Sequence, residues 1–171
     1  TKKDIIDIYG ISDDRIEVIY HGHSHDEQQI KPVYNLPKKY ILFVGQRDGY
    51  KNFGRLLRSF GRLHEKYPEI RLVCTGQSFN KQEMADINAL GLADSVFRYF
   101  VSDSQLTFLY KNAVCFVFPS LYEGFGIPIL ESFAAGCPLA LSDTSCFPEI
   151  ARDGGVYFDP YDEDNICEVL T

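Results

Sequence analysis

The sequence predicts an α/β fold built on a doubly wound parallel sheet of the Rossmann-like type. Continuous apolar runs of strand length recur along the chain, which is typical of strands that are covered on both faces. Segments with helical periodicity lie between these runs. An alternation of strand and helix favours a parallel sheet with helices packed on both faces.

Five apolar runs are the expected strands: 15–20, 40–45, 70–74, 113–118 and 138–142. Between the first two runs, residues 21–38 are less regular and contain Pro32 and Pro37, so we expect a surface excursion there. Ligands of doubly wound sheets bind beyond the carboxyl ends of the strands. A functional site is therefore expected in the loops that follow Val44, Cys74 and Phe118.

Helices are expected at 52–67, 80–90, 103–112, 127–136 and 162–171. The first is the clearest, because its apolar residues fall on one face at helical spacing. Asn52 is its expected N-cap, and Pro68 should end it. In the fourth helix, Pro128 suits the first turn and Gly136 the C-terminal cap.

The composition favours a single globular domain, since 45% of the 171 residues are apolar and 24% are charged. The net charge is −7, so no overall field attracts nucleic acid, and any anion site must be local. No apolar run approaches the roughly 20 residues that a membrane-spanning helix needs. The chain begins without Met and ends within a helical pattern, and we expect it to be part of a longer protein.

A basic pair follows the expected strand at 40–45, in the stretch FVGQRDGYKNFGRLL. Arg47 and Lys51 stand four residues apart, between Gly45 and the start of a helix. The first N–H groups of a helix lack internal partners, so this loop could hold a diphosphate. The alternative is two solvated basic side chains beside a turn. The stretch is neither a P-loop nor a GxGxxG fingerprint.

An acidic pair follows the expected strand at 113–118, in the stretch PSLYEGFGIPILE. Gly124 and Gly126 permit close approach of a ligand to the backbone. Glu123 lies in the loop and Glu131 about one turn into the next helix, where carboxylates could accept hydrogen bonds from vicinal hydroxyls. The alternative is that Glu131 is a solvated helix residue and that Glu123 is an acid placed favourably near the positive N-terminal end of the helix. We expect the basic and acidic pairs to converge on one crevice.

The spacing of this acidic pair, written Glu123-GFGIPIL-Glu131, resembles the E-x7-E signature of retaining glycosyltransferases of the two-domain GT-B architecture, family-four type. The resemblance covers nearly the whole chain in order, through IYGISDDRIEVIYHG, FVGQRDGYKNFGRLLRSF, LVCTG, VSDSQLTFLYKNAVCFVFPS and SFAAGCPLALSDTSCFPEIARDGGVYFDP. It implies that residues 1–171 are the C-terminal, nucleotide-sugar (donor) binding domain. The N-terminal acceptor domain would then be absent from this chain.

The family implies roles for the matched positions. Arg47 and Lys51 would bind the donor diphosphate and stabilise the charge of the leaving group. Glu123 would contact hydroxyls of the transferred sugar, and Glu131 the ribose. Backbone groups would complete the donor site at Gly45, at Phe100 and Val101 beside the base, and at Gly124, Phe125 and Gly126 beside the sugar and phosphate.

The resemblance also implies the reaction and the partners. A sugar would pass from a nucleotide-diphosphate sugar, with retention, to a glycan or lipid-linked glycan held by the N-terminal domain, in polysaccharide or glycolipid biosynthesis. No cofactor or metal is expected, and the isolated chain should be nearly inactive. The full-length protein is expected in the cytoplasm, peripheral to the inner face of the membrane.

Cysteine and histidine usage agrees with a site that needs no metal. The five cysteines have no metal-ligand spacing, and we expect reduced, mostly buried thiols of a cytosolic protein. His21, His23 and His25 alternate, which on a strand would place three imidazoles on one face, as in a metal site. Because they enter a loop, and because the family has no metal there, we expect none.

Two other classes of function remain open at this point. A doubly wound interaction or regulatory domain without catalysis would leave the basic and acidic pairs to chance. A nucleotide-sugar epimerase or a phosphorylase would share the architecture. A phosphorylase needs a lysine for pyridoxal phosphate, and the matching segment has none.

Overall fold

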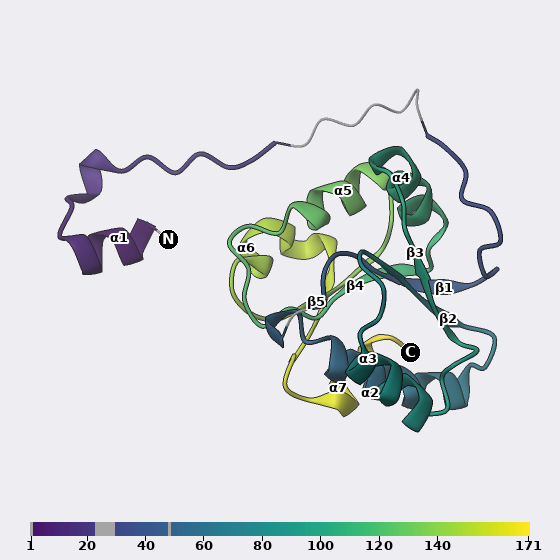
Figure 1. The fold of residues 1–171 in the computed structure, drawn as a ribbon. Helices are drawn as coiled ribbons and strands as arrows, with labels where there is room; N and C mark the ends of the chain where they lie inside the picture. Colours follow the sequence, from purple (N-terminus) through teal and green to yellow (C-terminus); the bar gives the residue numbers. More distant parts are fainter. Residues whose placement is uncertain (1, 23–29, 48) are drawn as a thin grey trace.

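The computed structural model of the chain describes residues 2–22, 30–47 and 49–171. Its strands are β1 (Tyr40–Phe43), β2 (Arg71–Thr75), β3 (Val96–Tyr99), β4 (Cys115–Phe118), β5 (Leu139–Ser142) and β6 (Val156–Phe158). They form a six-stranded parallel sheet in the order β3-β2-β1-β4-β5-β6 (Figure 1). This is the Rossmann strand order, in which the winding reverses between β1 and β4. The predicted fold class is confirmed.

Helices cover both faces of the sheet (Figure 1). One face carries α2 (Phe53–Lys66), α3 (Lys81–Ala89) and α7 (Glu163–Val169), and the other carries α4 (Asp103–Asn112), α5 (Ile127–Ala135) and α6 (Phe147–Ala151). The five predicted helices are confirmed to within two residues at each end. The other helical elements among the described residues are α1 (Lys2–Tyr9) and the 3-10 turns η1 (Asp13–Arg15), η3 (Gly49–Lys51) and η4 (Arg152–Gly154).

The core divides into two layers because successive side chains of a strand point to opposite faces of the sheet. In β1, Ile41 and Phe43 pack with α2, α3 and α7. Tyr40 and Leu42 pack instead with α4, α5 and α6. The buried hydroxyl of Tyr40 donates a hydrogen bond to the carbonyl oxygen of Leu109 at 2.8 Å. Every residue of β1 is buried, as its continuous apolar run predicts.

The strand predicted at 15–20 is wrong. Residues 16–20 join no ladder of the sheet, and the side chains of Val18 and Ile19 are 51% and 81% exposed. This segment and α1 form an N-terminal arm, residues 2–22, that extends to one side of the sheet (Figure 1). An apolar run becomes a strand only where a neighbouring strand completes its hydrogen bonds, and no described segment does so here.

Both edge strands of the sheet, β3 and β6, and the short helices α1 and α6 were not predicted from the sequence. The edge strands have four and three residues, and most of their side chains are only partly buried. Edge strands have one neighbour, so they need less apolar surface than central strands. The continuous apolar pattern that identifies central strands is therefore absent from them.

Candidate functional site

The site predicted from sequence lies where the winding of the sheet reverses. The loop that follows β1 leads into η3, and the loop that follows β4, residues 119–126, leads into α5. The N–H of Leu121 donates to the carbonyl oxygen of Tyr50 at 2.8 Å, so the two loops are directly joined. In open α/β sheets the crevice at such a reversal is the usual place for a ligand.

Lys51 and Glu123 meet between these two loops. The Lys51 Nζ lies 2.6 Å from the Glu123 Oε1, and the two side chains are 15% and 14% exposed. The ammonium group also lies 5.3 Å from the centre of the Phe118 ring. The structure therefore brings together one member of the basic pair and one member of the acidic pair, from loops 72 positions apart in the sequence.

Asn52, directly after Lys51, ties the loops around the site together. It stands at the predicted N-cap position of α2, but its side chain makes no capping hydrogen bond, and its φ is 58°. Its amide instead donates to the carbonyl oxygens of Pro119 at 3.1 Å and Pro160 at 2.8 Å. The capping role predicted for its side chain is wrong. Asparagine is one of the few residues that enter the left-handed region readily, which suits it to this position.

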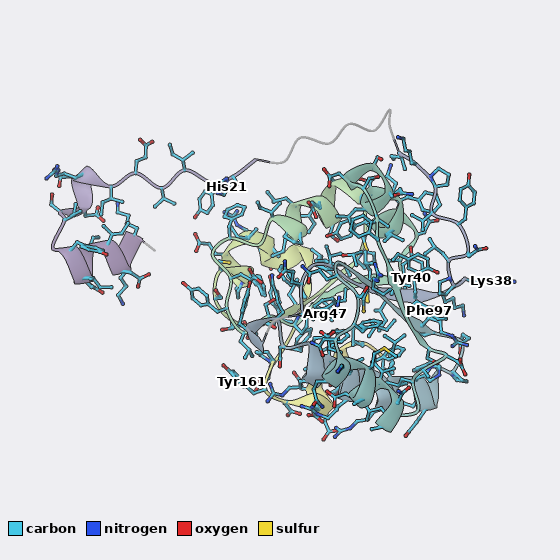
Figure 2. All side chains as sticks on the ribbon, in the orientation of Figure 1. His21, Lys38, Tyr40, Arg47, Phe97 and Tyr161 are labelled. Carbon is cyan, nitrogen blue, oxygen red and sulfur yellow. The ribbon has the colours of Figure 1, made fainter. Side chains whose placement is uncertain are left out.

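Arg47 faces a different part of the molecule from Lys51. Its Nε donates to Glu83 Oε1 at 3.0 Å, and the side chain is only 3% exposed. Its terminal nitrogens donate to backbone carbonyl oxygens between β2 and α3, those of Thr75, Gln77 and Ser78. The guanidinium also lies 4.8 Å from the centre of the Phe79 ring. Arg47, labelled in Figure 2, thus holds the loop after β1 against the loop after β2.

The backbones of these two loops touch at Gly45 and Gly76. The N–H of Gly45 donates to Thr75 Oγ1 at 3.1 Å. A Cβ added to Gly76 would lie 2.7 Å from the carbonyl oxygen of Gly45, and the φ of Gly76 is 95°. Gly76 is therefore required for the close approach. It was not among the residues predicted for the site, although a glycine directly after a buried strand was a signal that could have identified it.

The glycine turn before α5 is shaped by the core beneath it. Gly126, the N-cap residue of α5, has a φ of 88°. A Cβ at this position would lie 3.1 Å from the side chain of Ile129 and 3.3 Å from the ring of Phe147. The turn therefore requires glycine at 126 because of the packing beneath it. The close approach of a ligand to this backbone stays a prediction. Gly124 and Phe125 precede it, and Gly124 is exposed.

The carboxylate of Glu131 is held by a tyrosine of α4. Its Oε2 accepts a hydrogen bond of 3.0 Å from the hydroxyl of Tyr110. Burial, together with the charge of Glu131, raises the pKa of Tyr110 well above its ordinary value, so the phenol stays a neutral donor. The structure does not bring Glu131 into contact with Lys51 or Glu123.

Val101, predicted near the base, follows β3, and the neighbouring Phe100 is 85% exposed.

A cavity of about 660 Å³ separates the N-terminal arm from the loops after β4 and β5. Glu123, Gly124 and Phe125 line it, whereas Arg47, Lys51, Glu131 and Val101 do not. The ring of His21 meets the ring of Phe125 edge-on at 5.1 Å, and Figure 2 shows His21 where the arm approaches the domain. A second cavity of about 470 Å³ at the ends of β5 and β6 contains none of the predicted site residues. The cavity beside Glu123 is the one that relates to the predicted chemistry.

The alternating histidines and the five cysteines, considered above as possible metal ligands, have different outcomes. His23 and His25 lie outside the described residues, and no three His, Cys, Asp or Glu side chains gather in a metal-binding arrangement within 2–22, 30–47 and 49–171. All five cysteines are free, and Cys74, Cys137 and Cys167 are buried, which confirms that part of the prediction. Burial raises the pKa of the Cys115 thiol to about 12.

In the part of the chain that the structure describes, no helix has the length and apolar character to cross a bilayer.

Comparison with known proteins identifies the relatives of this chain. The family model described as "Glycosyl transferases group 1" matches residues 24–171. O-antigen chain mannosyltransferase B of Escherichia coli is 31% identical over 182 residues, which cover 97% of this chain and 47% of that protein. O-antigen chain mannosyltransferase RfbU of Salmonella typhimurium is 34% identical over 166 residues, covering 95% and 45%. The chain spans about half the length of these curated relatives.

Solved structures show the same fold. The C-terminal domain of a glycosyl transferase group 1 family protein (LpcC) from Francisella tularensis has a TM-score of 0.70 and 22% identity, covering 86% of each chain. The lipopolysaccharide outer core galactosyltransferase WaaB has a TM-score of 0.73 and 24% identity, covering 99% of this chain and 49% of that one. The chain belongs to the glycosyl transferases group 1 family, and its sheet and flanking helices match the C-terminal domains of GT-B glycosyltransferases.

Proposed function

We propose that this chain is the donor-binding domain of a retaining glycosyltransferase and that it binds a nucleotide-diphosphate sugar in the crevice between the loops after β1 and β4. The observation that carries the proposal is the contact between Lys51 and Glu123 at the reversal point of the sheet. A cation and a carboxylate side by side in a crevice suit a ligand that combines a diphosphate with sugar hydroxyls.

In this proposal the diphosphate lies between Lys51 and the N–H groups of residues 124–127, in the turn that opens α5. The helix N-terminus and the ammonium group both favour negative charge, and both would stabilise the charge that develops as the diphosphate leaves. This positive charge comes from side chains and backbone, so the proposal assigns no role to a metal ion. Glu123 then accepts hydrogen bonds from the transferred sugar, and Glu131, oriented by Tyr110, accepts them from the ribose.

The two members of the basic pair have different parts. Lys51 reaches the diphosphate directly. Arg47 supports the site by fixing the loop after β1 against Glu83 and the loop after β2. Direct contact between Arg47 and the diphosphate stays a prediction, and it would require the guanidinium to give up part of this network. Gly45 and Val101, at the ends of β1 and β3, remain the proposed backbone contacts of the donor.

The relatives suggest the class of the complete reaction. Two of them are described as O-antigen chain mannosyltransferases and one as a lipopolysaccharide outer core galactosyltransferase. We propose that the full-length protein transfers a hexose to a glycan or lipid-linked glycan in polysaccharide or glycolipid biosynthesis, at the cytoplasmic face of the membrane. Its acceptor would be held by an N-terminal domain, without which this chain transfers little or no sugar.

Titration calorimetry of this chain with UDP, GDP and ADP tests the donor site. We expect one of these nucleotides to bind, and we expect Lys51→Ala to weaken its binding by about ten- to a hundredfold, the loss of a charge-assisted hydrogen bond. Lys39→Ala is the matched control, because Lys39 pairs with Glu69 away from the crevice. Absence of binding heat with all three nucleotides would contradict the proposal, as would equal effects of the two substitutions.

A further inference from the structure

The loop between β5 and α6, residues 143–146, grips the main chain of Glu123. The hydroxyl oxygen of Ser145 accepts a hydrogen bond from the Glu123 N–H at 3.1 Å, and the same hydroxyl donates to the Glu123 carbonyl oxygen at 2.8 Å. The thiol of Cys146 donates to that carbonyl oxygen at 3.4 Å. Both backbone polar groups of Glu123 are therefore fixed by side chains about 22 positions further along the chain.

Ser145 makes these contacts from a strained backbone conformation. Its φ is 57°, in the left-handed region that residues with a side chain rarely adopt. Such strain persists where the surrounding structure holds it in place, and it concentrates at functional sites. Here Ser145 contacts the main chain of Glu123, the residue proposed above to bind the sugar of the donor.

The strained loop is anchored to the core beneath the glycine turn. Phe147 is fully buried, and its ring centre lies 4.7 Å from that of Phe118 at the end of β4. The same ring occupies the space that a Cβ at Gly126 would need. The loop after β5 therefore contacts the loop after β4 at two places, under Gly126 and at the Glu123 main chain. Such a platform resists movement of the Glu123 Cα.

We propose that Ser145 is a positioning residue that fixes the main chain of Glu123 so that its carboxylate meets the sugar of the donor. Ser145 does not touch the donor itself. Two restraints act on Glu123: Ser145 holds its backbone, and Lys51 holds its carboxylate. When a diphosphate binds the ammonium group of Lys51, the carboxylate of Glu123 is released and can rotate towards a sugar hydroxyl. The Cα of Glu123 stays in place. This inference rests on the donor site proposed above.

Substitution by glycine separates positioning from folding. Ser145→Gly removes the hydroxyl but also relieves the strain, since glycine adopts positive φ freely. We expect this variant to stay folded by circular dichroism. Ser145→Ala removes the hydroxyl and keeps the strain, so the two variants together show which property matters. Asn35→Gly is the matched control, because Asn35 has a φ of 60° and lies outside the proposed donor machinery.

The readout is calorimetric affinity for nucleoside diphosphates (UDP, GDP, ADP) compared with their hexose conjugates (UDP-glucose, GDP-mannose, ADP-glucose). For the pair that the wild-type chain binds, we expect both Ser145 variants to keep the diphosphate affinity within about twofold and to lose about tenfold in affinity for the conjugate, the size of a charge-assisted hydrogen bond. Asn35→Gly should change neither affinity.

Two results would overturn the inference. Either the Ser145 variants bind the hexose conjugate like the wild type, or they lose affinity equally for both ligands, as a general structural role would require. Recovery of the conjugate affinity in Ser145→Gly alone would likewise assign the effect to strain and not to the hydroxyl. Failure of the wild-type chain to bind any of the six compounds would instead contradict the proposed donor site, which distinguishes the two failures.

Discussion

Lys51 and Glu123 neutralise each other across the crevice, and this has a consequence for ligand binding. The Lys51 Nζ lies 2.6 Å from the Glu123 Oε1, and the two side chains are 15% and 14% exposed. The ammonium group is therefore already paired with a carboxylate. We expect a diphosphate that binds Lys51 to displace Glu123, because two anions beside one ammonium group repel each other. In the proposed site, the carboxylate that would bind the sugar competes with the phosphate when no sugar is present.

Glu123→Gln tests this competition. The substitution removes the negative charge with little change of shape, so we expect the affinity for a nucleoside diphosphate to rise by about three- to tenfold, which corresponds to the worth of a partly exposed ion pair. The gain should shrink at high salt because the charges are then screened. Titration calorimetry at low and high ionic strength measures both effects. A loss of diphosphate affinity in this variant would show that Lys51 does not exchange partners.

At the scale of elements, the loops after neighbouring strands are bound to one another more tightly than the sequence alone indicates. The loop after β1 is joined to the loop after β2 through Arg47 and Gly76, and to the loop after β4 through Asn52 and Leu121. The site is therefore a property of several loops acting together. A change in one loop should alter the position of the others.

Gly76→Ala tests the contact between the first two loops. The added Cβ would meet the Gly45 carbonyl oxygen at 2.7 Å, and alanine would also be strained at a φ of 95°. Gly91→Ala is the control, since Gly91 has a φ of 68° and nothing lies within 4 Å of its added Cβ. We expect the control to cost about 1 kcal/mol, from backbone strain alone, and Gly76→Ala to cost about 2 kcal/mol more from the clash. Urea unfolding measures the difference, and equal costs would contradict the requirement for close approach.

The sequence predicted those elements whose physical signal is local. The buried strands and the amphipathic helix α2 carry their own periodicity, and the turn at Gly124 and Gly126 has its own composition. The strand predicted at 15–20 was wrong because an apolar run forms a strand only beside a neighbouring strand, and no local sequence pattern specifies that neighbour. For the same reason Glu123 and Lys51 could be named as site residues, whereas the hydrogen bonds from Asn52 and Ser145 could not, because each joins loops distant in sequence.

At the scale of the molecule, an acidic chain presents a cation where the proposed donor would bind. The net charge is −7, yet Lys51 lies at the reversal point of the sheet, in contact with the loop that leads into α5. Arg47 is bonded to the strand and loop of β2, and Glu131 to Tyr110. Of the four side chains expected to converge, only Lys51 and Glu123 meet. The central claim is therefore geometric, and it concerns where a nucleotide sits on this sheet.

A crystal structure of this chain with a bound nucleoside diphosphate is the most direct measurement of that claim. We expect the diphosphate within hydrogen-bonding distance, about 3 Å, of Lys51 Nζ and of the N–H groups of residues 124–127, with the ribose hydroxyls on Glu131 and with Glu123 released from Lys51. A nucleotide bound away from the ends of β1 and β4, or bound while Lys51 and Glu123 remain paired, would contradict the account.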